Sequence, residues 1–446
     1  MRILLLVGFC LKSERIISVK RILLSIAVLL SMVGFCKAAE QAEKEVKSDS
    51  IMERNSLTNG FFGLNNRLAD SGLELRLSAT QIYQQNTRGG ISTHRKAGRF
   101  TGSYDLELTA DLQKLLGIEG GRFYILTESS FSNGIDGPSV GSYFGVNGDG
   151  EGNRSIMVTE MWYEQSAFDD NLRVRVGKLD LTGGFDHHNC PVAFDCSMYA
   201  NNENNQFLNS ALINNPTIPF PDRGLGVAAY LHPMSSWYLS AGAADAKADS
   251  RETGFNTTFD GQSDFFYIFE TGITPKITSA KGPLQGAYRI GLWVDGQNKQ
   301  KFSDGENHRN DTGFYTTCDQ MLWKEKDEPN DSQGLGGFFR AGFANGKFDD
   351  VTDFWSIGLQ YQGLLEGRDD DVLAFGMAQG VFTEQANAND GNGYSSDNET
   401  VFETYYNIAV TPWLHISPDV QYIANPGGDK AVNDAVVVGI RIQMVF

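Results

Sequence analysis

The clearest pattern of apolar and polar positions lies in the last residues of the chain, Ala435–Phe446. From Val436 onward every second residue is apolar, and the positions between them include Gly439, Arg441 and Gln443. Successive side chains of a β-strand point to opposite faces, so this segment is predicted to have one apolar and one partly polar face. In an outer-membrane β-barrel, these faces contact lipid and a water-filled lumen. The alternative is an edge strand of a periplasmic sandwich.

Similar alternating segments recur along the whole chain, and we count about sixteen of them, an even number in the range of bacterial barrels. They are Leu73–Tyr83, Phe100–Leu112, Arg122–Ser129, Ile156–Gln165, Leu172–Leu179, Leu225–Leu231, Tyr238–Ala244, Phe265–Thr274, Ala287–Val294, Phe314–Met321, Gly337–Phe343, Phe354–Tyr361, Asp371–Gln379, Glu399–Thr411, Leu414–Tyr422 and Ala435–Phe446. The predicted fold class is therefore all-β, a transmembrane antiparallel β-barrel.

The connections between these strands alternate in length. Those after odd-numbered strands are mostly long, such as Gln84–Gly98 and Asp180–Gly224, whereas several after even-numbered strands are short, such as Ala167–Asn171 and His232–Trp237. Long outer loops and short periplasmic turns are typical of bacterial barrels, and this order places both termini on the periplasmic side. The long even connection Leu322–Gly336 is an exception that the scheme does not predict.

The first residues have the pattern of an exported protein. Lys20 and Arg21 precede an apolar run from Ile22 to Phe35, and the next residues end in Ala38, a small residue suited to cleavage. We predict a signal peptide at residues 1–38, with residues 1–18 as an extension upstream of the true start. Residues 39–70 are predicted to form a polar periplasmic arm, and residues 71–446 the barrel. No other apolar run is long enough to span a bilayer as a helix, so membrane insertion has to use strands.

Composition narrows the choice further. A net charge of −18 argues against nucleic acid as a partner, because nucleic-acid binding needs basic surfaces. The 49 glycines and the aromatic content of 11% fit alternating strands. After the leader, only Cys190, Cys196 and Cys318 remain. In an oxidising compartment, Cys190 and Cys196 are positioned to close a small loop, which leaves Cys318 unpaired.

Strand parity assigns charged side chains to the lumen. Glu107, Glu160, Trp162, Arg173 and Arg175 alternate with apolar neighbours and are predicted to face inward. Further inward positions are Asp105, Thr109, Asp111, Glu164, Arg289, Trp293, Asp295, Glu403, Tyr405, Asn407, His415, Asp419 and Gln421. Carboxylates accept hydrogen bonds from sugar hydroxyls, guanidinium groups donate to them, and aromatic faces cover the apolar side of a sugar ring. Any water-filled barrel has polar inward residues, however, so composition alone does not favour sugars over ions.

Three segments, taken in order, resemble the carbohydrate-selective porins of the OprB type. They are Arg173–Asp180, Gln206–Ser210 followed by Asn214–Pro221 and Gly224–Gly226, and Val410–Leu414 followed by Pro418–Gly428. The similarity extends from about residue 57 to the end of the chain. It implies a sixteen-stranded channel that passes glucose and related sugars by facilitated diffusion, through a constriction of charged and aromatic residues.

The resemblance also makes Arg173–Asp180 part of the expected constriction. Lys178 and Asp180 fall on the lipid-facing parity of their strand, so we expect a bulge at Gly177 or the strand end to turn them inward. The connection Asp180–Gly224 is the expected loop that folds in and narrows the pore. Its segment Asp186–Cys190, with Cys196, departs from the pattern expected of the family.

Two short motifs have alternative interpretations. His187, His188, Cys190 and Cys196 are residue types that bind zinc, but their spacing matches no standard site, and a small disulfide is favoured. Asn147, Asp149 and Glu151 alternate like the first calcium ligands of an EF-hand, but Val158 stands where the closing Glu belongs. This segment is therefore predicted to be a flexible glycine-rich outer loop.

Neither HExxH nor GxSxG is evident, and we predict neither enzymatic activity nor a cofactor or metal. The sequence predicts a passive sugar porin of the outer membrane, with carbohydrate solutes and outer-membrane lipid as partners. The C-terminal strand ending in Phe446 is expected to engage the barrel assembly machinery, and monomer and homotrimer both remain open. The rival hypotheses are a general charge-selective porin and a non-conducting barrel that serves as an adhesin or structural protein.

Overall fold

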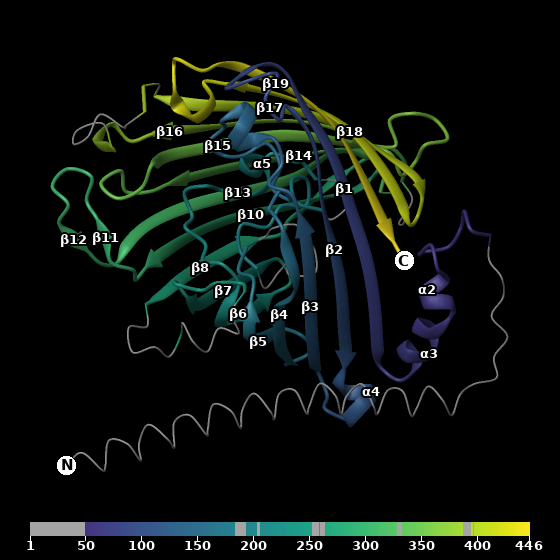
Figure 1. The fold of residues 1–446 in the computed structure, drawn as a ribbon. Coiled ribbons are helices and arrows are strands. Elements are labelled where there is room, and N and C mark those ends of the chain that lie inside the picture. Colours follow the sequence, from purple (N-terminus) through teal and green to yellow (C-terminus); the bar gives the residue numbers. More distant parts are fainter. Residues whose placement is uncertain are drawn as a thin grey trace, which may run out of the picture.

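The computed structural model describes residues 50–182, 193–202, 206–251, 258, 264–327, 332–386, 394–395 and 397–446. The predicted signal peptide, His187, His188 and Cys190 lie outside these residues. Within the described part, the chain forms a closed antiparallel β-barrel of 16 strands, which confirms the predicted fold class (Figure 1).

Each strand pairs with its neighbours in sequence, apart from the closure of the barrel. The strands of the wall are β1 (Leu73–Gly90), β2 (Gly98–Asp111), β3 (Gly121–Phe131), β4 (Arg154–Ala167), β5 (Leu172–Leu179), β6 (Gly224–Met234), β7 (Trp237–Asp245), β8 (Phe265–Ile273), β9 (Lys276–Ser279), β10 (Gly282–Asp295), β13 (Asp311–Lys324), β14 (Gly334–Phe343), β15 (Val351–Gln362), β16 (Val372–Phe382), β17 (Asn398–Thr411), β18 (Leu414–Ala424) and β19 (Asn433–Val445). The ring closes between β1 and β19, which pair from Ser78 opposite Val445 to Gly90 opposite Asn433.

The segments β8 and β9 together make one strand of the wall. Both pair with β10, β8 as far as Ile273 opposite Tyr288 and β9 from Lys276 opposite Gln285. Pro275 lies between them and has no backbone N–H to donate, which interrupts the ladder at this point. A small hairpin of β11 (Lys299–Gln300) and β12 (Asn307–His308) projects from the wall.

The alternation that predicted the strands also separates their two faces. On β16, Leu373 and Phe375 are 37% and 50% exposed on the outer face, whereas Ala374 and Ala378 are buried on the inner face. Other large apolar side chains, such as Ile290, are likewise exposed on the outside. No helix among the described residues is long and apolar enough to cross a membrane.

Both described chain ends lie at the same end of the barrel, which we call the turn end. The amide of Leu57 donates to the carbonyl of Val445, and the amide of Phe446 donates to that of Leu77. The longest connections, residues 132–153 and 180–223, emerge at the opposite end, the loop end. Two predicted lengths were wrong: β1 extends to Gly90, and the apparent exception Leu322–Gly336 shrinks to residues 325–333 because β13 and β14 are longer than their alternation suggested.

The part of the predicted arm that the structure describes packs against the turn end of the barrel. It contains α2 (Asn59–Phe62) and α3 (Leu64–Asp70). Asn65 of α3 accepts a hydrogen bond from the amide of Leu75 at 2.8 Å, beside the part of β1 that β19 does not reach. Leu68 is buried in a cluster with residues of β1, β2 and α4 (Leu112–Leu116).

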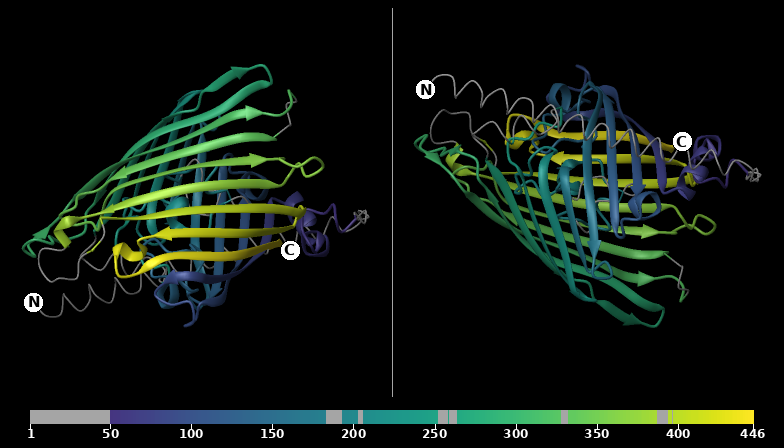
Figure 2. Two further views of the ribbon diagram at one scale, coloured as in Figure 1. Left: turned by 90° about the horizontal axis from the view of Figure 1, so that it is seen from above. Right: turned by 90° about the horizontal axis from the view of Figure 1, so that it is seen from below.

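Two loops turn into the barrel instead of projecting from it. We call them L2 (residues 132–153, with the short helix η1, Asp136–Val140) and L3 (residues 180–223, with α5, Ser210–Ile213). Figures 1 and 2 show the ribbon of L3, with α5, inside the ring of strands. The main apolar cluster lies there, where Phe207 and Leu212 of L3 and Val146 of L2 pack on Phe338 and Tyr405 of the wall. The short helices η3 (Glu384–Ala386) and η4 (Pro426–Gly428) belong to the loop end.

Candidate functional site: the lumen and its two walls

One side of the lumen, formed by β13–β19, fastens L3 through buried charges. Arg340 on β14 is fully buried and donates to the carbonyls of Leu212 (2.9 Å) and Ile213 (2.6 Å) from Nη1. Its Nη2 donates to the carbonyl of Asp195 (2.9 Å) and to Oδ1 of Asn201 (2.6 Å), and Nε lies 3.3 Å from the Asp195 carboxylate. A single guanidinium thus binds the C-terminal end of α5 and a backbone carbonyl of L3 well before that helix.

Acidic side chains of the same wall hold other parts of L3. Glu403 on β17 accepts from the amides of Leu208 (2.6 Å) and Asn209 (2.8 Å). Asp319 on β13 accepts from the Ser197 hydroxyl at 2.6 Å and pairs with Arg289 at 2.9 Å. Sequence parity correctly placed Glu403 and Arg289 inside the barrel, but Glu403 binds the loop and Arg289 pairs with Asp319, which in turn holds Ser197 of the loop.

Small residues of the wall make room for the apolar part of L3. A Cβ added at Gly376 on β16 would lie 2.9 Å from both Leu212 and Phe207. The Phe207 ring meets those of Tyr405 and Phe338 edge-on, with centroids 5.2 and 5.9 Å apart. We call this side, β13–β19 with L3, the packed wall.

L2 is held in a similar way at the loop end. Glu399 on β17 accepts from the Ser142 hydroxyl (2.6 Å) and from the amide of Tyr143 (2.8 Å). The carbonyl of Val146 accepts from Gln84 on β1 (2.8 Å) and from Gln421 on β18 (2.9 Å). L2 is therefore not the free outer loop that its glycine content predicted, and it carries Asp149 into the lumen.

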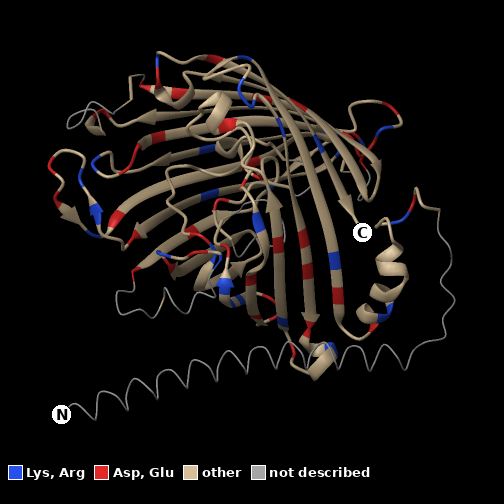
Figure 3. Cartoon of the chain, in the orientation of Figure 1, with Lys and Arg blue, Asp and Glu red and all other residues tan. Residues whose placement is uncertain are grey.

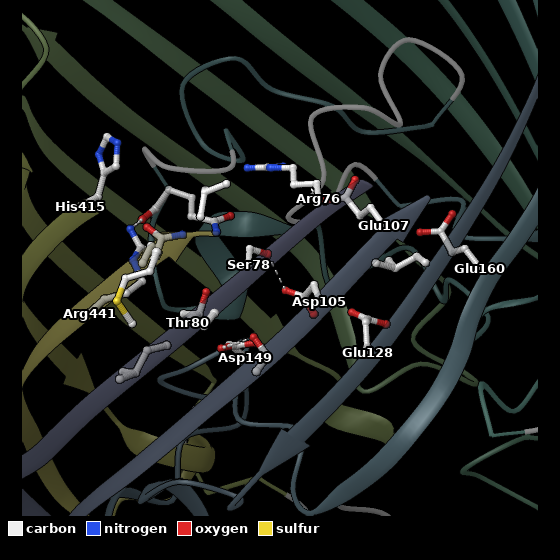
Figure 4. A pocket seen from close by; sticks show the side chains of 18 of the residues that line it. Arg76, Ser78, Thr80, Asp105, Glu107, Glu128, Asp149, Glu160, His415 and Arg441 are labelled. Atoms are coloured by element: carbon white, nitrogen blue, oxygen red, sulfur yellow. Dashed lines mark hydrogen bonds and ion pairs between the residues drawn. The ribbon is translucent and has the colours of Figure 1, made fainter. Parts of the chain in front are cut away.

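The other side of the lumen, formed by β1–β4, stays open and is rich in charge; we call it the open wall (Figure 3). A cavity of about 120 Å³ lies between the open wall, L2, L3 and the edge of β19. Its charged lining residues are Arg76, Arg223 and Arg441 together with Asp105, Glu107, Glu128, Asp149, Glu160 and Asp180 (Figure 4). Tyr124, Trp413 and His415 add rings to the lining.

Several of these charges form ion pairs that are partly exposed. Arg76 lies 3.3 Å from Glu107, which also accepts from the Tyr124 hydroxyl at 3.1 Å. Arg223 bridges Glu128 (2.8 Å) on β3 and Asp180 (3.4 Å) at the start of L3. Side chains in these pairs keep between 12% and 23% of their surface exposed, so they remain within reach of a solute.

The loop residues of the cavity have shifted pKa values. Burial raises the pKa of Asp149 to about 7, although the Ser103 hydroxyl donates to its carboxylate at 3.2 Å. Burial works against the charge of Arg223, but the carboxylates of Glu128 and Asp180 outweigh it, and the pKa of Arg223 lies well above its ordinary value.

The structure places the predicted site residues at two depths. Glu107 and Asp180 line the cavity and stay partly exposed, whereas Glu160 borders the cavity but is only 1% exposed. Trp162 and Arg175 face inward as predicted but are only 1% and 3% exposed. The Trp162 ring lies between Tyr124, with centroids 4.8 Å apart, and the Arg175 guanidinium, 3.8 Å away. The Trp162 indole N–H donates to Glu160 at 3.0 Å, and Arg175 pairs with Glu164 at 2.9 Å.

The remaining predicted residues lie at the ends of β5. Gly177 has a φ of 146°, and a Cβ there would lie 2.3 Å from the carbonyl of Met161, which is consistent with the expected local irregularity. Lys178 is buried, and its Nζ donates to the carbonyls of Val158 (2.9 Å) and Ser250 (2.5 Å). Arg173 lies near the turn end, opposite Ser166 and Tyr230.

Sequence reasoning missed Arg223 and Arg76 as site residues. Arg223 precedes β6 at the end of a long loop, where alternation carries no information about direction. Arg76 lies on the first strand, whose short inward side chains gave little sign of the lumen. For Arg223, the one available signal was its position, because it is a basic residue just before a predicted strand and after an asparagine-rich loop.

The cysteines and histidines add no metal centre to the described structure. Cys196 is disulfide-bonded, and Cys318 is free. Because Cys190 lies outside the described residues, its pairing with Cys196 stays a prediction, as does any role of His187 and His188. In the described part of the chain, no group of three or more His, Cys, Asp or Glu side chains is arranged to hold a metal ion.

Comparisons with known proteins give the barrel a family. The profile of the carbohydrate-selective porin, OprB family, matches residues 95–446. Porin B of Pseudomonas aeruginosa is 26% identical over 419 residues, covering 86% of this chain and 90% of its own length. The putative porin QuiX of Acinetobacter baylyi is 23% identical, covering 88% and 94%.

Solved structures agree on the fold. The high-pH structure of Pseudomonas putida OprB matches with a TM-score of 0.76 at 22% identity, covering 89% of this chain and 100% of that one. Its low-pH structure matches with a TM-score of 0.56 at 20% identity. The chain belongs to the OprB family of carbohydrate-selective porins.

Proposed function

We propose that this protein is a passive outer-membrane channel for carbohydrates and that solutes cross along the open wall. The observation that carries the proposal is the contrast between the two walls. L3 and its fastening residues fill the packed wall, and the cavity beside β1–β4 retains carboxylate and guanidinium groups that are partly exposed. A neutral solute with many hydroxyls finds both donors and acceptors there without having to bring a counter-ion.

The physical basis of passage is exchange of hydrogen bonds. A sugar that enters the cavity loses water contacts and gains bonds to pairs such as Arg76–Glu107 and Arg223–Glu128. Because the net worth of each exchanged bond is small, about 0.5–1.5 kcal/mol, the solute is held weakly and can leave. The concentration gradient drives the flux, and neither an enzymatic step nor a cofactor is needed.

The seven residues predicted from the sequence take different parts in this proposal. Glu107 and Asp180 contact the solute, because they line the cavity and stay partly exposed, and the buried Glu160 supports the cavity wall from just behind. Trp162 and Arg175 lie behind them and hold Glu160 in position. Lys178 ties β5 to the loop after β7 through Ser250, and Arg173 contributes positive charge near the turn end of the lumen.

We also propose a placement in the membrane. The loop end, with its long connections, faces outward, and the turn end with both termini faces the periplasm, as is typical of bacterial barrels. The predicted signal peptide at residues 1–38 directs export, and residues 39–70 form the periplasmic arm, of which the described part packs at the turn end. We further propose that the β19 strand ending in Phe446 is recognised during barrel assembly, and that a homotrimer is an alternative to a monomer.

One observation favours a second function, a general cation-selective porin. Six carboxylates and three guanidinium groups line the cavity, and excess negative charge enriches cations in a narrow pore.

Single-channel recording in planar bilayers separates these functions. Addition of glucose or maltose is expected to lower the mean current in a concentration-dependent manner. Unchanged current in the presence of sugar, with strong cation preference, would support the second function instead. Absence of conductance would support the non-conducting barrel. Glu107→Gln should weaken the sugar effect, whereas Asp369→Gln, in the turn between β15 and β16, should leave it unchanged.

A further inference from the structure

Among the described residues, Asp105 of the open wall and Asp149 of L2 form no ion pair, and Arg223 and Arg441 act on them only from a longer distance. Among the cavity carboxylates, Glu107 pairs with Arg76, and Glu128 and Asp180 pair with Arg223. Asp105 and Asp149, by contrast, form no ion pair within the described structure. Oδ1 of Asp105 is buried and has no hydrogen-bond partner, and its Oδ2 accepts only a long bond, 3.5 Å, from the Ser78 hydroxyl.

Asp105 and Asp149 converge on the same part of the cavity. Asp149 accepts from the hydroxyl of Ser103 at 3.2 Å, and Ser103 lies two residues before Asp105 on the inner face of β2. Figure 4 shows both carboxylates turned toward the lumen, with Glu128 beside them and Ser78 behind. Carboxylates so close together repel each other unless a proton or a cation compensates their charge.

Resting on the proposed function, we infer that Asp105 and Asp149 form a seat for the ammonium group of an amino sugar. A protonated amine brings one positive charge and three N–H donors, which suits two carboxylates with unused acceptor positions. The hydroxyls of the same solute reach the Arg76–Glu107 pair on the adjacent strands. The substrate class is thus a hexosamine, a sugar that carries a free primary amine.

The surroundings fit an organic ammonium group. The Ser78 hydroxyl lies beside Asp105 and the Ser103 hydroxyl beside Asp149, and Tyr124 lines the same cavity next to Glu107. Such hydroxyl groups match a sugar, whereas the described residues offer no cluster arranged to hold a metal ion. Burial raises the pKa of Asp149 to about 7. A bound ammonium group favours the ionised carboxylate, so binding is accompanied by release of a proton near neutral pH.

The test compares three probes of similar shape in single-channel recordings at neutral pH: glucose, glucosamine and N-acetylglucosamine, which lacks the positive charge. Glucosamine is expected to block at a concentration about fivefold lower than glucose, an advantage of the size that a partly buried charge pair supplies. N-acetylglucosamine should show no such advantage. High salt should reduce the advantage, because it screens the charges.

Two variants test whether the stronger block by glucosamine depends on Asp105 and Asp149. Asp105→Asn and Asp149→Asn keep the shape but remove the charge, and each should bring the ratio of glucose to glucosamine blocking concentrations toward one. Asp369→Asn, far from the cavity at the turn end, should leave the ratio as it is. A ratio that stays high in both seat variants would overturn the inference, and so would an equally strong block by ethylammonium.

The outcomes also distinguish this inference from the function on which it rests. Block by glucose without any advantage for glucosamine would refute the ammonium seat and leave the sugar channel intact. Absence of block by every sugar would refute both.

Discussion

The packed wall and the open wall carry similar side chains but use them differently. Arg340, Glu403 and Asp319 on the packed wall are almost completely buried and bond to the backbone of L3. Arg76 and Glu107 on the open wall keep 22% and 12% of their side-chain surface exposed. Inward direction alone therefore does not make a charged residue part of the solute path.

The difference has an energetic reason. A backbone group that loses water costs free energy unless it finds a partner, and L3 carries many such groups into the lumen. The buried charges of β13, β14 and β17 supply these partners. These charges therefore hold L3 in place and do not bind solutes. On β1–β3, Arg76, Glu107 and Glu128 border the cavity and keep part of their surface exposed, so water and solutes can still exchange there.

Replacement of Arg340 on the packed wall and of Arg76 on the open wall should give the largest difference between the two walls. Arg340→Met removes the guanidinium that donates to the L3 carbonyls of Leu212 and Ile213. It also leaves the buried Asp195 carboxylate without its cationic partner. Breaking a buried pair in this way costs about 3–5 kcal/mol. We expect a lower thermal unfolding temperature in detergent and a noisier, larger conductance, because L3 loosens.

Arg76→Met is the matched change on the open wall. Its partly exposed ion pair with Glu107 contributes about 1 kcal/mol or less to the free energy of unfolding, so the unfolding temperature should change little. The pore should instead become more cation-selective in reversal-potential measurements. Equal destabilisation by the two variants would show that the walls do not differ as described.

A second change enlarges the packed wall from inside. Gly376→Leu places a side chain where Leu212 and Phe207 of L3 now lie, 2.9 Å from the position of its Cβ. Overpacking of this kind costs about 1–3 kcal/mol, and displacement of L3 relieves it. Single-channel conductance should rise and sugar block should weaken. Phe375→Leu, the neighbour on the lipid-facing side, is the control and should alter neither.

The alternation of side chains was sufficient to predict the barrel, because the membrane and the lumen impose period two on every strand. The same rule placed Glu107, Glu160 and Trp162 inside. It did not predict which inward residues a loop covers, since that depends on contacts between Glu403 and Leu208 or Arg340 and Leu212, far apart in sequence.

Loops were the main source of error. The glycine-rich segment around Asp149 reads as a mobile outer loop, yet hydrogen bonds from Gln84 and Gln421 to Val146 draw it into the lumen. Arg223 likewise occupies the cavity only because L3 returns to the wall there. Both positions are set by tertiary contacts that have no local pattern.

A substitution of Trp162, which lies behind the cavity-lining residues of the open wall, should have a smaller effect. Trp162→Phe keeps the ring between Tyr124 and Arg175 but removes the N–H that donates to Glu160. A hydrogen bond to a charged group contributes about 1.5–3 kcal/mol at most, and Glu160 has other interactions, so sugar block should weaken only about two- to fivefold. Trp237→Phe, whose N–H donates to Thr271 instead, should leave sugar block as it is. A loss of block as large in Trp237→Phe would mean that Trp162 has no special part.

The smallest expected effect is a change of selectivity with pH. The carboxyl of Asp149, with its pKa raised to about 7 by burial, is mostly protonated below this pH and mostly ionised above it. Cation preference, measured as the reversal potential in a salt gradient, should therefore rise between mildly acidic and mildly alkaline solution. Histidines in general also change charge in this range, so His415, which lines the same cavity, is replaced by Gln in both backgrounds. Asp149→Asn should then flatten the remaining dependence, while Arg340, already committed to L3, contributes nothing to it. A dependence that persists unchanged in Asp149→Asn would assign the titration to another group and would remove Asp149 from the solute path of the open wall.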